Sequence, residues 1–455
     1  MRISVIGTGY VGLVSGACFA EIGHDCICVD VDTSKVERIN RGEPPIHENG
    51  LEDLLKRHVG TRLRATTDLR SAVIDSEITF IAVGTPFDGS RIDLSFVREA
   101  ARQIGLAIRD KGSYHVVVVK STVVPGTTDE VVLAELERAS GLRAGVDFGV
   151  GMNPEFLTEG VAIDDFMKPD RIVLGGIDER SAEAQRKVYA PFTQTPTMTT
   201  NNKTAEMIKY TSNSVLATMI SFSNEIGNLC NALGGVDVAD VMQGVHMARY
   251  FTSTLPDGQR VKAPIASFLW ASCGYGGSCL PKDTKALSAH GAAYGLAMPL
   301  LDAVIHTNLA QPKQMIALLE RRFPKLDGLK VAVLGLAFKE DTDDIRESPA
   351  IPIIKLLLER GVQVTGYDPI SNQAARAVLP AGVNFADSLE AAVGGVSAAL
   401  LVTRWKEFER LPELLKKTPD TLVIDGRRVL APTSLANYEG IGRQVKPQAP
   451  KVHAS

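Results

Sequence analysis

The sequence of 455 residues lacks several features that mark whole classes of proteins. Its six cysteines show no CxxC pair and no Cys/His spacing, so neither a zinc site nor a disulfide framework is indicated. The net charge of −4 gives no basic field for nucleic acid or anionic lipid. No apolar run reaches the roughly 18 residues that a membrane span needs. We therefore expect no metal, no nucleic acid and no membrane among the partners of this chain.

The composition that remains is typical of a globular protein, with 45% hydrophobic and 22% charged residues. The chain is too long for one hydrophobic core, so we expect two or three domains. The first residues lead directly into an apolar strand and do not resemble a signal peptide, which predicts a cytoplasmic protein.

A glycine-rich turn near the N-terminus predicts a dinucleotide site. Residues 3–6 form a short apolar strand, and the glycine turn and a helical run follow it; the turn reads Gly7, Thr8, Gly9, Tyr10, Val11, Gly12. The next strand ends in Asp30, where this fold places an acid for the adenosine ribose. The glycines let a pyrophosphate approach the helix N-terminus, and Asp30 would repel a 2′-phosphate. NAD is therefore favoured over NADP, and a tight turn without a ligand is the alternative.

Polar residues follow three further apolar strands of this segment. Thr85 and Thr122 come just after strands at residues 78–83 and 115–119, where doubly wound sheets bind ligands. Either threonine could instead be a plain helix cap. Glu155 and Glu159 follow a strand at residues 148–150, and on a short helix they would share one face. Two such carboxylates suggest proton handling, with a solvated acidic turn as the alternative.

A long helix is predicted over residues 201–233, between two asparagines that can cap it and a Gly-Gly pair that stops it. Its apolar residues form one stripe, which indicates that it joins domains or pairs with a second subunit; they lie at positions 208, 215, 219, 222, 226, 229 and 233. Lys209 and Asn213 are four residues apart and would project together. Lys209 is a candidate catalytic residue, although a lone lysine is normally solvated.

A cysteine follows three glycines at residues 274–283, in the stretch GYGGSCLPKD. Glycines let the backbone bend closely around a small polar molecule. Lys282 and Asp283 follow Cys279 closely, and a nearby cation favours the nucleophilic thiolate of a cysteine. Cys279 is therefore either a nucleophile or a small buried hydrophobic residue.

Beyond residue 327 the strand–loop–helix–strand order of the first segment repeats without its glycine turn. Lys339 follows the first strand of this repeat, where it could meet a phosphate. The predicted fold class is α/β, with two Rossmann-like doubly wound domains joined by a long central helix and a small helical domain. The predicted bounds are 1–200 for the NAD-binding domain, 201–315 for the helical domain, 316–440 for the second Rossmann-like domain and 441–455 for a disordered tail.

Six motifs together resemble the UDP-glucose/GDP-mannose dehydrogenase family across residues 1 to about 430: GTGYVG with Asp30, NPEFLTEG, KYTSN, GYGGSCLPKD, FKEDTDDIRES and DGRR. The resemblance implies a four-electron oxidation of the C6 alcohol of a nucleotide sugar to a carboxylate, with two NAD+ and one water consumed. UDP-glucose is the first expected substrate and GDP-mannose the alternative. The resemblance also implies a homo-oligomer, at least a dimer, built on the central helix.

The same resemblance assigns roles by motif. Cys279 forms the thiohemiacetal and then the thioester, Lys209 stabilises oxyanions with Asn213 beside it, and Asp283 and Glu155 manage water and protons with help from Thr122. The implied cofactor contacts are Gly7, Thr8, Gly9, Tyr10, Val11, Gly12, Asp30, Lys35, Thr85, Pro86, Ser121, Thr122, Glu159, Lys282 and Arg346. The implied substrate contacts are Glu155, Phe156, Leu157, Glu159, Lys209, Asn213, Arg260, Phe268, Tyr275, Gly276, Phe338, Lys339 and Arg427.

One stretch departs from the family pattern. The family usually carries a short Arg-Ile-Gly element before the cysteine loop, and its arginine reaches the neighbouring subunit's site. Here residues 249–270 are longer, and both Arg249 and Arg260 are available, of which Arg260 is favoured. Two other readings stay open: a two-electron hydroxyacid dehydrogenase, which would not need the thiol, and a cofactor-binding sensor without activity.

Overall fold

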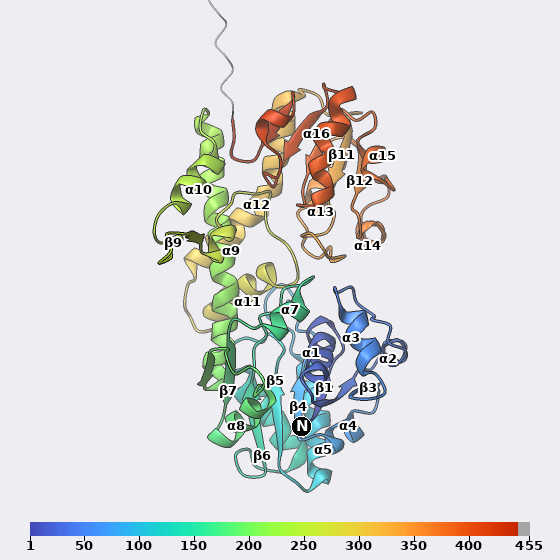
Figure 1. Ribbon diagram of the computed structural model, residues 1–455, viewed down its shortest axis with the longest axis vertical. Helices are drawn as coiled ribbons and strands as arrows, with labels where there is room; N and C mark the ends of the chain where they lie inside the picture. Colours follow the sequence, from blue (N-terminus) through green and yellow to red (C-terminus); the bar gives the residue numbers. More distant parts are fainter. Residues whose placement is uncertain (445–455) are drawn as a thin grey trace, which may run out of the picture. The chain divides into compact units, whose positions relative to one another are not determined.

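Figure 1 shows the computed structural model, which describes residues 1–444. The chain divides into two compact units. Unit 1 comprises Met1–Ser212 and Ala289–Tyr294, and unit 2 comprises Asn213–Ser288 and the described residues from Gly295 onward. Within residues 1–444, no helix is both long enough and apolar enough to cross a membrane.

Unit 1 is built on an eight-stranded sheet in the order β3-β2-β1-β4-β5-β6-β7-β8. Neighbouring strands are parallel except β6 and β7, which are antiparallel. The strands are β1 (Arg2–Ile6), β2 (Asp25–Val29), β3 (Leu63–Thr66), β4 (Ile78–Ile81), β5 (His115–Val119), β6 (Phe148–Met152), β7 (Ile172–Gly176) and β8 (Thr197–Thr200). Most of them are short apolar runs, as expected for parallel strands that are covered on both faces.

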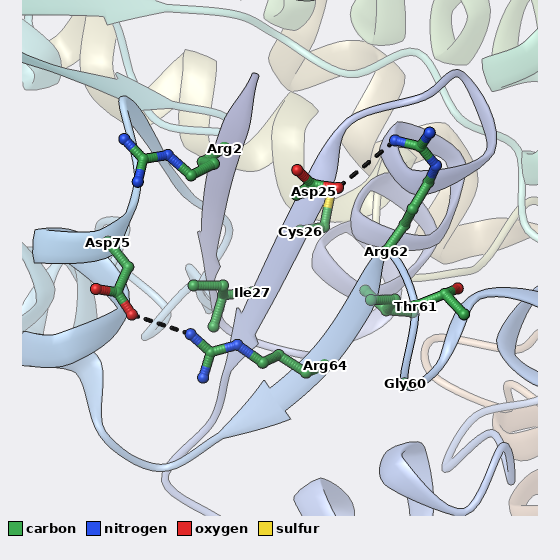
Figure 2. A pocket seen from close by; sticks show the side chains of 10 residues that line it. Arg2, Asp25, Cys26, Ile27, Gly60, Thr61, Arg62, Arg64 and Asp75 are labelled. Atoms are coloured by element: carbon green, nitrogen blue, oxygen red, sulfur yellow. Dashed lines mark hydrogen bonds and ion pairs between the residues drawn. The ribbon is translucent and has the colours of Figure 1, made fainter.

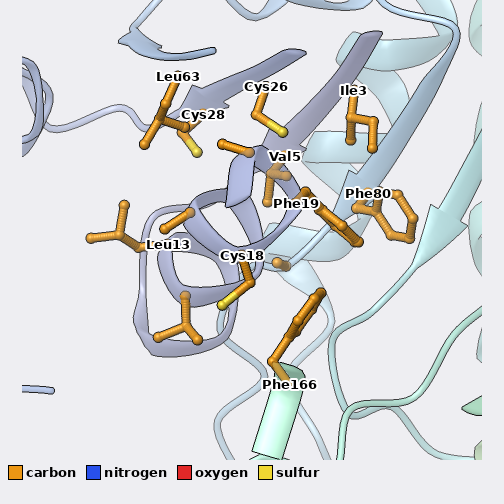
Figure 3. Packing of buried hydrophobic residues seen from close by; sticks show 14 of the residues in the cluster. Ile3, Val5, Leu13, Cys18, Phe19, Cys26, Cys28, Leu63, Phe80 and Phe166 are labelled. Carbon is orange, nitrogen blue, oxygen red and sulfur yellow. The ribbon is translucent and has the colours of Figure 1, made fainter. Parts of the chain in front are cut away.

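Helices cover both faces of this sheet because successive strand residues point to opposite sides. On β1, Ile3 and Val5 belong to one core cluster and Ile6 to another. The helices of unit 1 are α1 (Tyr10–Glu21), α2 (Thr33–Asn40), α3 (Leu51–His58), α4 (Leu69–Asp75), α5 (Ser95–Lys111), α6 (Leu133–Ser140), α7 (Ala162–Met167) and α8 (Glu179–Val188). Figure 3 shows the core beneath α1, where the Phe19 ring lies 5.0 Å from the Phe80 ring. Burying such a ring contributes about 1.5–3 kcal/mol and fixes α1 against the sheet.

Unit 2 contains a second parallel sheet, in the order β13-β12-β11-β14-β15-β16. Its strands are β11 (Lys330–Leu334), β12 (Gln363–Tyr367), β13 (Asn384–Phe385), β14 (Ala398–Leu401), β15 (Leu422–Asp425) and β16 (Tyr438–Gly440). The helices that follow its strands are α13 (Ala350–Leu358), α14 (Asn372–Val378), α15 (Leu389–Val393) and α16 (Leu411–Leu414). Both sheets reverse their strand order beside their first strand, and doubly wound sheets bind ligands at such a switch point.

The long predicted helix is present as α9 (Asn202–Leu233). The side chain of Asn201 accepts a hydrogen bond from the backbone N–H of Thr204 and so caps its N-terminus. Gly234 and Gly235 both have positive φ and end it. The other elements are α10 (Val238–His246), the hairpin β9 (Thr252–Thr254) and β10 (Arg260–Lys262), α11 (Leu280–Ala293) and α12 (Pro299–Arg322).

The predicted fold class is confirmed, since both units contain doubly wound α/β sheets and α9 is the long helix between them in sequence. The predicted domain bounds stay predictions. Within the stretch predicted as a disordered tail, Ile441 is fully buried and Arg443 lies 3.3 Å from Asp237. The remainder of that stretch, residues 445–455, lies outside the described residues.

Candidate functional site

The glycine turn of unit 1 is shaped so that only glycine fits at two of its positions. A Cβ on Gly7 would lie 2.7 Å from the carbonyl oxygen of Ala82, and a Cβ on Gly12 would lie 1.9 Å from that of Gly7. In contrast, the space in front of Gly9 is open to 4 Å. The turn thus packs tightly against the sheet and leaves bare backbone at the N-terminus of α1, which is the arrangement that a pyrophosphate needs.

Asp30 stands at the end of β2 and faces the same turn. Its carboxylate accepts hydrogen bonds from the backbone N–H of Thr8, at 2.9 Å, and from the Thr8 hydroxyl. Burial alone would raise the pKa of Asp30, but these bonds and one from the Asp32 backbone lower it below its ordinary value. Gly7, Gly9, Asp30 and Lys35 line a cavity of about 350 Å³. An ionised acid beside a bare glycine turn fits the adenosine half of a dinucleotide.

The residues at the ends of β4 and β5 are bonded to one another. The Thr85 hydroxyl donates to the carbonyl of Thr122 at 2.8 Å, and the Ser121 hydroxyl donates to the carbonyl of Val83 at 2.6 Å. The Thr122 hydroxyl is 3.5 Å from Glu155, a long hydrogen bond. Thr85 and Ser121 therefore join the ends of β4 and β5 at the carboxyl edge of the sheet.

The expectation of a short helix that carries Glu155 and Glu159 is wrong. Residues 153–158 follow β6 as an extended loop. Pro154 cannot donate a backbone hydrogen bond, and the Glu155 carboxylate instead accepts from the backbone N–H of Leu157 at 2.7 Å. Glu155 is buried, and Glu159 is only partly exposed. Glu155 and Glu159 therefore do not share a helix face, and of the two only the Glu155 carboxylate is buried.

Glu155 forms a buried ion pair with Lys209 of α9. The Nζ of Lys209 lies 2.8 Å from Oε1 of Glu155, and each side chain is only 4% exposed. Burial would raise the pKa of Glu155, but the charge and hydrogen bond of Lys209 outweigh it and lower that pKa below its ordinary value. The same ammonium lies 5.6 Å from the centre of the Phe156 ring. The structure thus brings Lys209, Glu155 and Phe156 together inside unit 1.

Cys279 occupies the residue before α11 in unit 2. Its carbonyl accepts the first helical hydrogen bond, from Asp283 at 2.8 Å, and its sulfur lies 3.6 Å from the Ser278 hydroxyl. The partial positive charge of a helix N-terminus favours a thiolate, and this placement was not visible in the sequence. Cys279 is partly exposed, whereas the other five cysteines are buried.

Asp283 is fully buried and holds two residues of the predicted site. Its carboxylate accepts from the side-chain amide of Asn213 at 2.6 Å and pairs with Lys282 at 2.6 Å. Lys282, predicted as a cofactor contact, is thus engaged by its own neighbour. Asn213 lies on α9, so this hydrogen bond ties the cysteine helix to the long helix within unit 2.

The glycines of the cysteine loop are packed against a second motif of unit 2. A Cβ on Gly277 would lie 2.7 Å from the ring of Phe338, and one on Gly276 would lie 2.3 Å from the carbonyl of Glu347. The backbone N–H of Gly277 donates to the carbonyl of Arg346 at 2.9 Å. The side chain of Arg346, predicted as a cofactor contact, lies 2.6 Å from Asp344. The segment around Phe338 therefore shapes the loop that carries the cysteine.

A polar cavity of about 270 Å³ in unit 2 gathers five of the predicted substrate residues: Phe268, Tyr275, Phe338, Lys339 and Arg427. Arg427 donates to the carbonyl of Val402 at 2.5 Å. Among the described residues, its buried Nη2 has no hydrogen-bond partner. A buried guanidinium nitrogen with an unmet donor indicates an acceptor that the ligand would supply.

Arg260 does not line this cavity; it lies in the exposed strand β10 and donates to the carbonyl of Met247 at 2.9 Å. Arg404, which the motifs did not indicate, does line it and donates to the carbonyl of Arg427. Its position in the sequence just after β14, at the carboxyl edge of the second sheet, is the signal that could have revealed it.

Another cavity, of about 370 Å³, lies at the amino ends of β1, β2 and β3 (Figure 2). Arg62 lies 3.5 Å from Asp25, and Arg64 lies 3.1 Å from Asp75. Asp25 and Asp75 thus offset the charges of Arg62 and Arg64, two of the three arginines that line this cavity. Doubly wound sheets bind ligands at the carboxyl ends of their strands, which lie at the opposite edge. We do not include it in the candidate site.

Comparison with known proteins identifies the family. Residues 1–193 match the NAD binding domain of the UDP-glucose/GDP-mannose dehydrogenase family, residues 203–310 its central domain and residues 332–432 its UDP binding domain. The chain belongs to this family. The resemblance carried by the six motifs is confirmed, and so is NAD as the cofactor of an oxidoreductase.

Individual relatives of this dehydrogenase cover almost its full length. It is 43% identical to the UDP-glucose 6-dehydrogenase AglM of Haloferax volcanii, over 97% of this chain and 100% of that one. It is 40% identical to the GDP-mannose 6-dehydrogenase of Pseudomonas aeruginosa, over 81% of each chain. A solved UDP-glucose dehydrogenase from Pyrobaculum islandicum is 41% identical, with a TM-score of 0.89 and 97% of each chain covered. This chain is thus an NAD-dependent nucleotide-sugar dehydrogenase.

Proposed function

We propose that this dehydrogenase oxidises the C6 alcohol of UDP-glucose to give UDP-glucuronate, with Cys279 as the covalent carrier. The observation that supports a nucleoside diphosphate is the charge of the unit 2 cavity. The charged residues that line it are three cations, Lys339, Arg404 and Arg427, and one carboxylate, Glu340, so positive charges exceed negative ones by two. A pyrophosphate diester carries about two negative charges at neutral pH, which match this excess.

The reaction proceeds in two oxidations that the thiol links. The C6 alcohol first loses a hydride to NAD+ and its hydroxyl proton to a carboxylate or water, and so becomes an aldehyde; the sulfur of Cys279 then adds to that aldehyde as a thiohemiacetal. The thiohemiacetal then loses a second hydride and its hydroxyl proton to become a thioester. Water then cleaves the thioester to release the carboxylate and regenerate the thiol. NAD+ supplies the oxidising power by accepting two electrons and a proton in each oxidation.

The buried charges of the two units suit this chemistry. Lys209 donates hydrogen bonds from a site that excludes water, where stabilisation of an oxyanion is strongest. Glu155 orients Lys209 and, as an ionised carboxylate, it can accept a proton from a bound water. Asp283 of α11, held by Asn213 and Lys282, is the second carboxylate for proton transfer.

UDP-glucose is preferred to GDP-mannose as the substrate because the UDP-glucose 6-dehydrogenase of Haloferax volcanii is 43% identical over 97% of this chain, whereas a GDP-mannose 6-dehydrogenase of similar coverage is 36% identical. The GDP-mannose dehydrogenases share comparable identity, over 81% of the chain for the Pseudomonas aeruginosa enzyme. GDP-mannose oxidation is therefore the second candidate. The cytoplasmic location stays a prediction.

Turnover of three sugars tests this assignment. With NAD+ in excess, we expect UDP-glucose to give two NADH per sugar, and UDP-galactose and GDP-mannose to give at least about 10-fold less kcat/KM because the site discriminates sugar stereochemistry and base. The measurement is NADH absorbance against sugar consumed. Turnover confined to GDP-mannose would replace the assignment with the second candidate. One NADH per sugar would eliminate the covalent route, and no NADH with any sugar would remove the function.

We also propose that the enzyme is at least a dimer that forms through the unit 2 part of α9. This part exposes an apolar stripe to solvent, formed by Val215, Phe222, Leu229 and Leu233. The residues recur at helical spacing, so they share one face. A contiguous exposed apolar face of this kind indicates a protein–protein contact.

Replacing Phe222, which is 55% exposed, with glutamate is expected to convert the oligomer into monomers. The buried charge would cost several kcal/mol in the interface and almost nothing in the free chain. Sedimentation velocity at micromolar concentration measures the change. Val378→Glu, which alters a similarly exposed residue on α14, is the matched control and should leave the mass unchanged. An unaltered oligomer in the Phe222 variant would place the contact elsewhere.

A further inference from the structure

A carboxylate that no motif indicated gathers three donors from separate parts of unit 1. Glu48 precedes α3 and is only 6% exposed. Its Oε2 accepts from the backbone N–H of Gly160 at 2.7 Å, and its Oε1 accepts from that of Ala162 at 2.8 Å. The hydroxyl of Tyr10, the first residue of α1, donates to the same carboxylate. Asn49 adds a bond from its side chain to the carbonyl of Gly160 at 2.9 Å.

These contacts fix the far end of the loop that carries Glu155. The near end is fixed independently at Asn153, whose side chain accepts from Lys120 at 2.8 Å and from Tyr189 at 2.5 Å. Asn153 also donates to the carbonyl of Val173 at 2.9 Å. Glu155 lies between these two anchors, on a stretch of loop with no helix or strand to hold it. Its reach to Lys209 therefore depends on both anchors.

The contact of Glu48 with Tyr10 connects this loop to the cofactor turn. Tyr10 directly follows Gly9, at the helix end where a pyrophosphate would bind. Its hydroxyl also accepts from the backbone N–H of Gly160 at 2.9 Å. Burial, followed by the bond to Glu48 and its charge, raises the pKa of Tyr10, so the hydroxyl stays a donor to the carboxylate. Glu48, Tyr10 and Gly160 thus form one closed network.

We propose that Glu48 is a positioning residue that holds the loop of residues 153–160 against the glycine turn, so that Glu155 meets Lys209 correctly aligned with the cofactor. This role deepens the proposed function and rests on it. Glu48 acts through the backbone of Gly160 and Ala162. A displacement of about 1 Å in a catalytic group can cost about 100-fold in rate, so a misplaced loop would lower turnover.

Glu48→Gln tests the proposal, because glutamine places an N–H₂ group where a carboxylate oxygen accepts a backbone hydrogen bond. We expect kcat to fall about 10-fold to 100-fold and KM for the nucleotide sugar to change by a smaller factor, since Lys339 and Arg427 of unit 2 still bind the diphosphate. Amide hydrogen exchange in the peptide around Gly160 and Ala162 should become faster in the variant. This readout stands even if no sugar is turned over, so failure of the proposed function is distinguishable from failure of the proposal.

Two further variants keep the test decisive. Glu52→Gln alters an exposed carboxylate in the first turn of α3, which pairs with Lys56, and should change neither kcat nor exchange. Asn49→Ala removes only the bond to the Gly160 carbonyl and should give a smaller effect in the same direction, and it serves if Glu48→Gln does not fold. Wild-type kcat and exchange in Glu48→Gln would overturn the proposal. Faster exchange spread across the whole of unit 1 would also overturn it, because it would indicate general destabilisation.

Discussion

Replacing Cys279 with serine is expected to reduce steady-state formation of UDP-glucuronate by at least about 10³-fold, because a serine hydroxyl is a far weaker nucleophile than a thiolate. The first oxidation does not need the sulfur. A slow release of aldehyde with one NADH per sugar should therefore persist. The measurement is the ratio of NADH to carboxylate product, which should be near two for the wild type and rise sharply in the variant.

Trapping the thioester on Cys279 tests the same prediction directly. Rapid acid quench of the wild type with UDP-glucose and NAD+ should add the mass of the oxidised sugar nucleotide to a peptide containing Cys279. The other thiols serve as internal controls, because they are buried. Burial raises the pKa of Cys18 and of Cys28 to about 12, so neither forms a thiolate near neutral pH. Normal turnover by the serine variant, or an adduct on another cysteine, would contradict the assignment.

The parts of the molecule that follow from local sequence were predictable. The glycine turn at Gly7 and the acid at Asp30 lie within one βαβ unit; the turn follows from the need of a backbone to approach a phosphate, and the acid from the ribose hydroxyls beside it. The bounds of α9 follow from Asn201 as the cap and from the Gly-Gly stop. Such features are determined by neighbours in the chain, so periodicity and turn chemistry reveal them.

Features that depend on distant segments were not predictable. The spacing of Glu155 and Glu159 suggested a helix, but Lys209, over fifty residues later, draws Glu155 inward, and Pro154 disfavours the helical bonding. Glu48 sits in a segment without a motif and acts on Gly160 by tertiary contact alone. Sequence spacing alone does not reveal these contacts, because they form only when distant segments of the chain fold together.

Breaking the Lys209–Glu155 ion pair is the second change for which we expect a large effect, here on both stability and activity. Lys209→Met should lower the free energy of unfolding of the wild type by about 3–5 kcal/mol, because it leaves a buried carboxylate without its cation. It should also lower kcat by about 100-fold or more through loss of the oxyanion donor. Chemical denaturation and NADH formation measure the two effects. Lys203→Met on the same helix, whose exposed side chain pairs with Glu130, is the matched control and should cost less than about 0.5 kcal/mol.

The pH dependence of the Lys209→Met effect separates charge from packing. In the wild type the pKa of Glu155 is lowered, so its contribution to stability is present above the ordinary value of 4.5 and is lost as the pH falls through the lower folded pKa. Without Lys209, burial raises the pKa of Glu155, and protonation then relieves the unpaired charge. The stability difference between variant and wild type should therefore shrink as the pH falls from 7 to 4. The double variant Lys209→Met/Glu155→Gln should recover part of the stability at pH 7 and none of the activity. A difference that is constant with pH would mean that the pair acts by packing and not by charge.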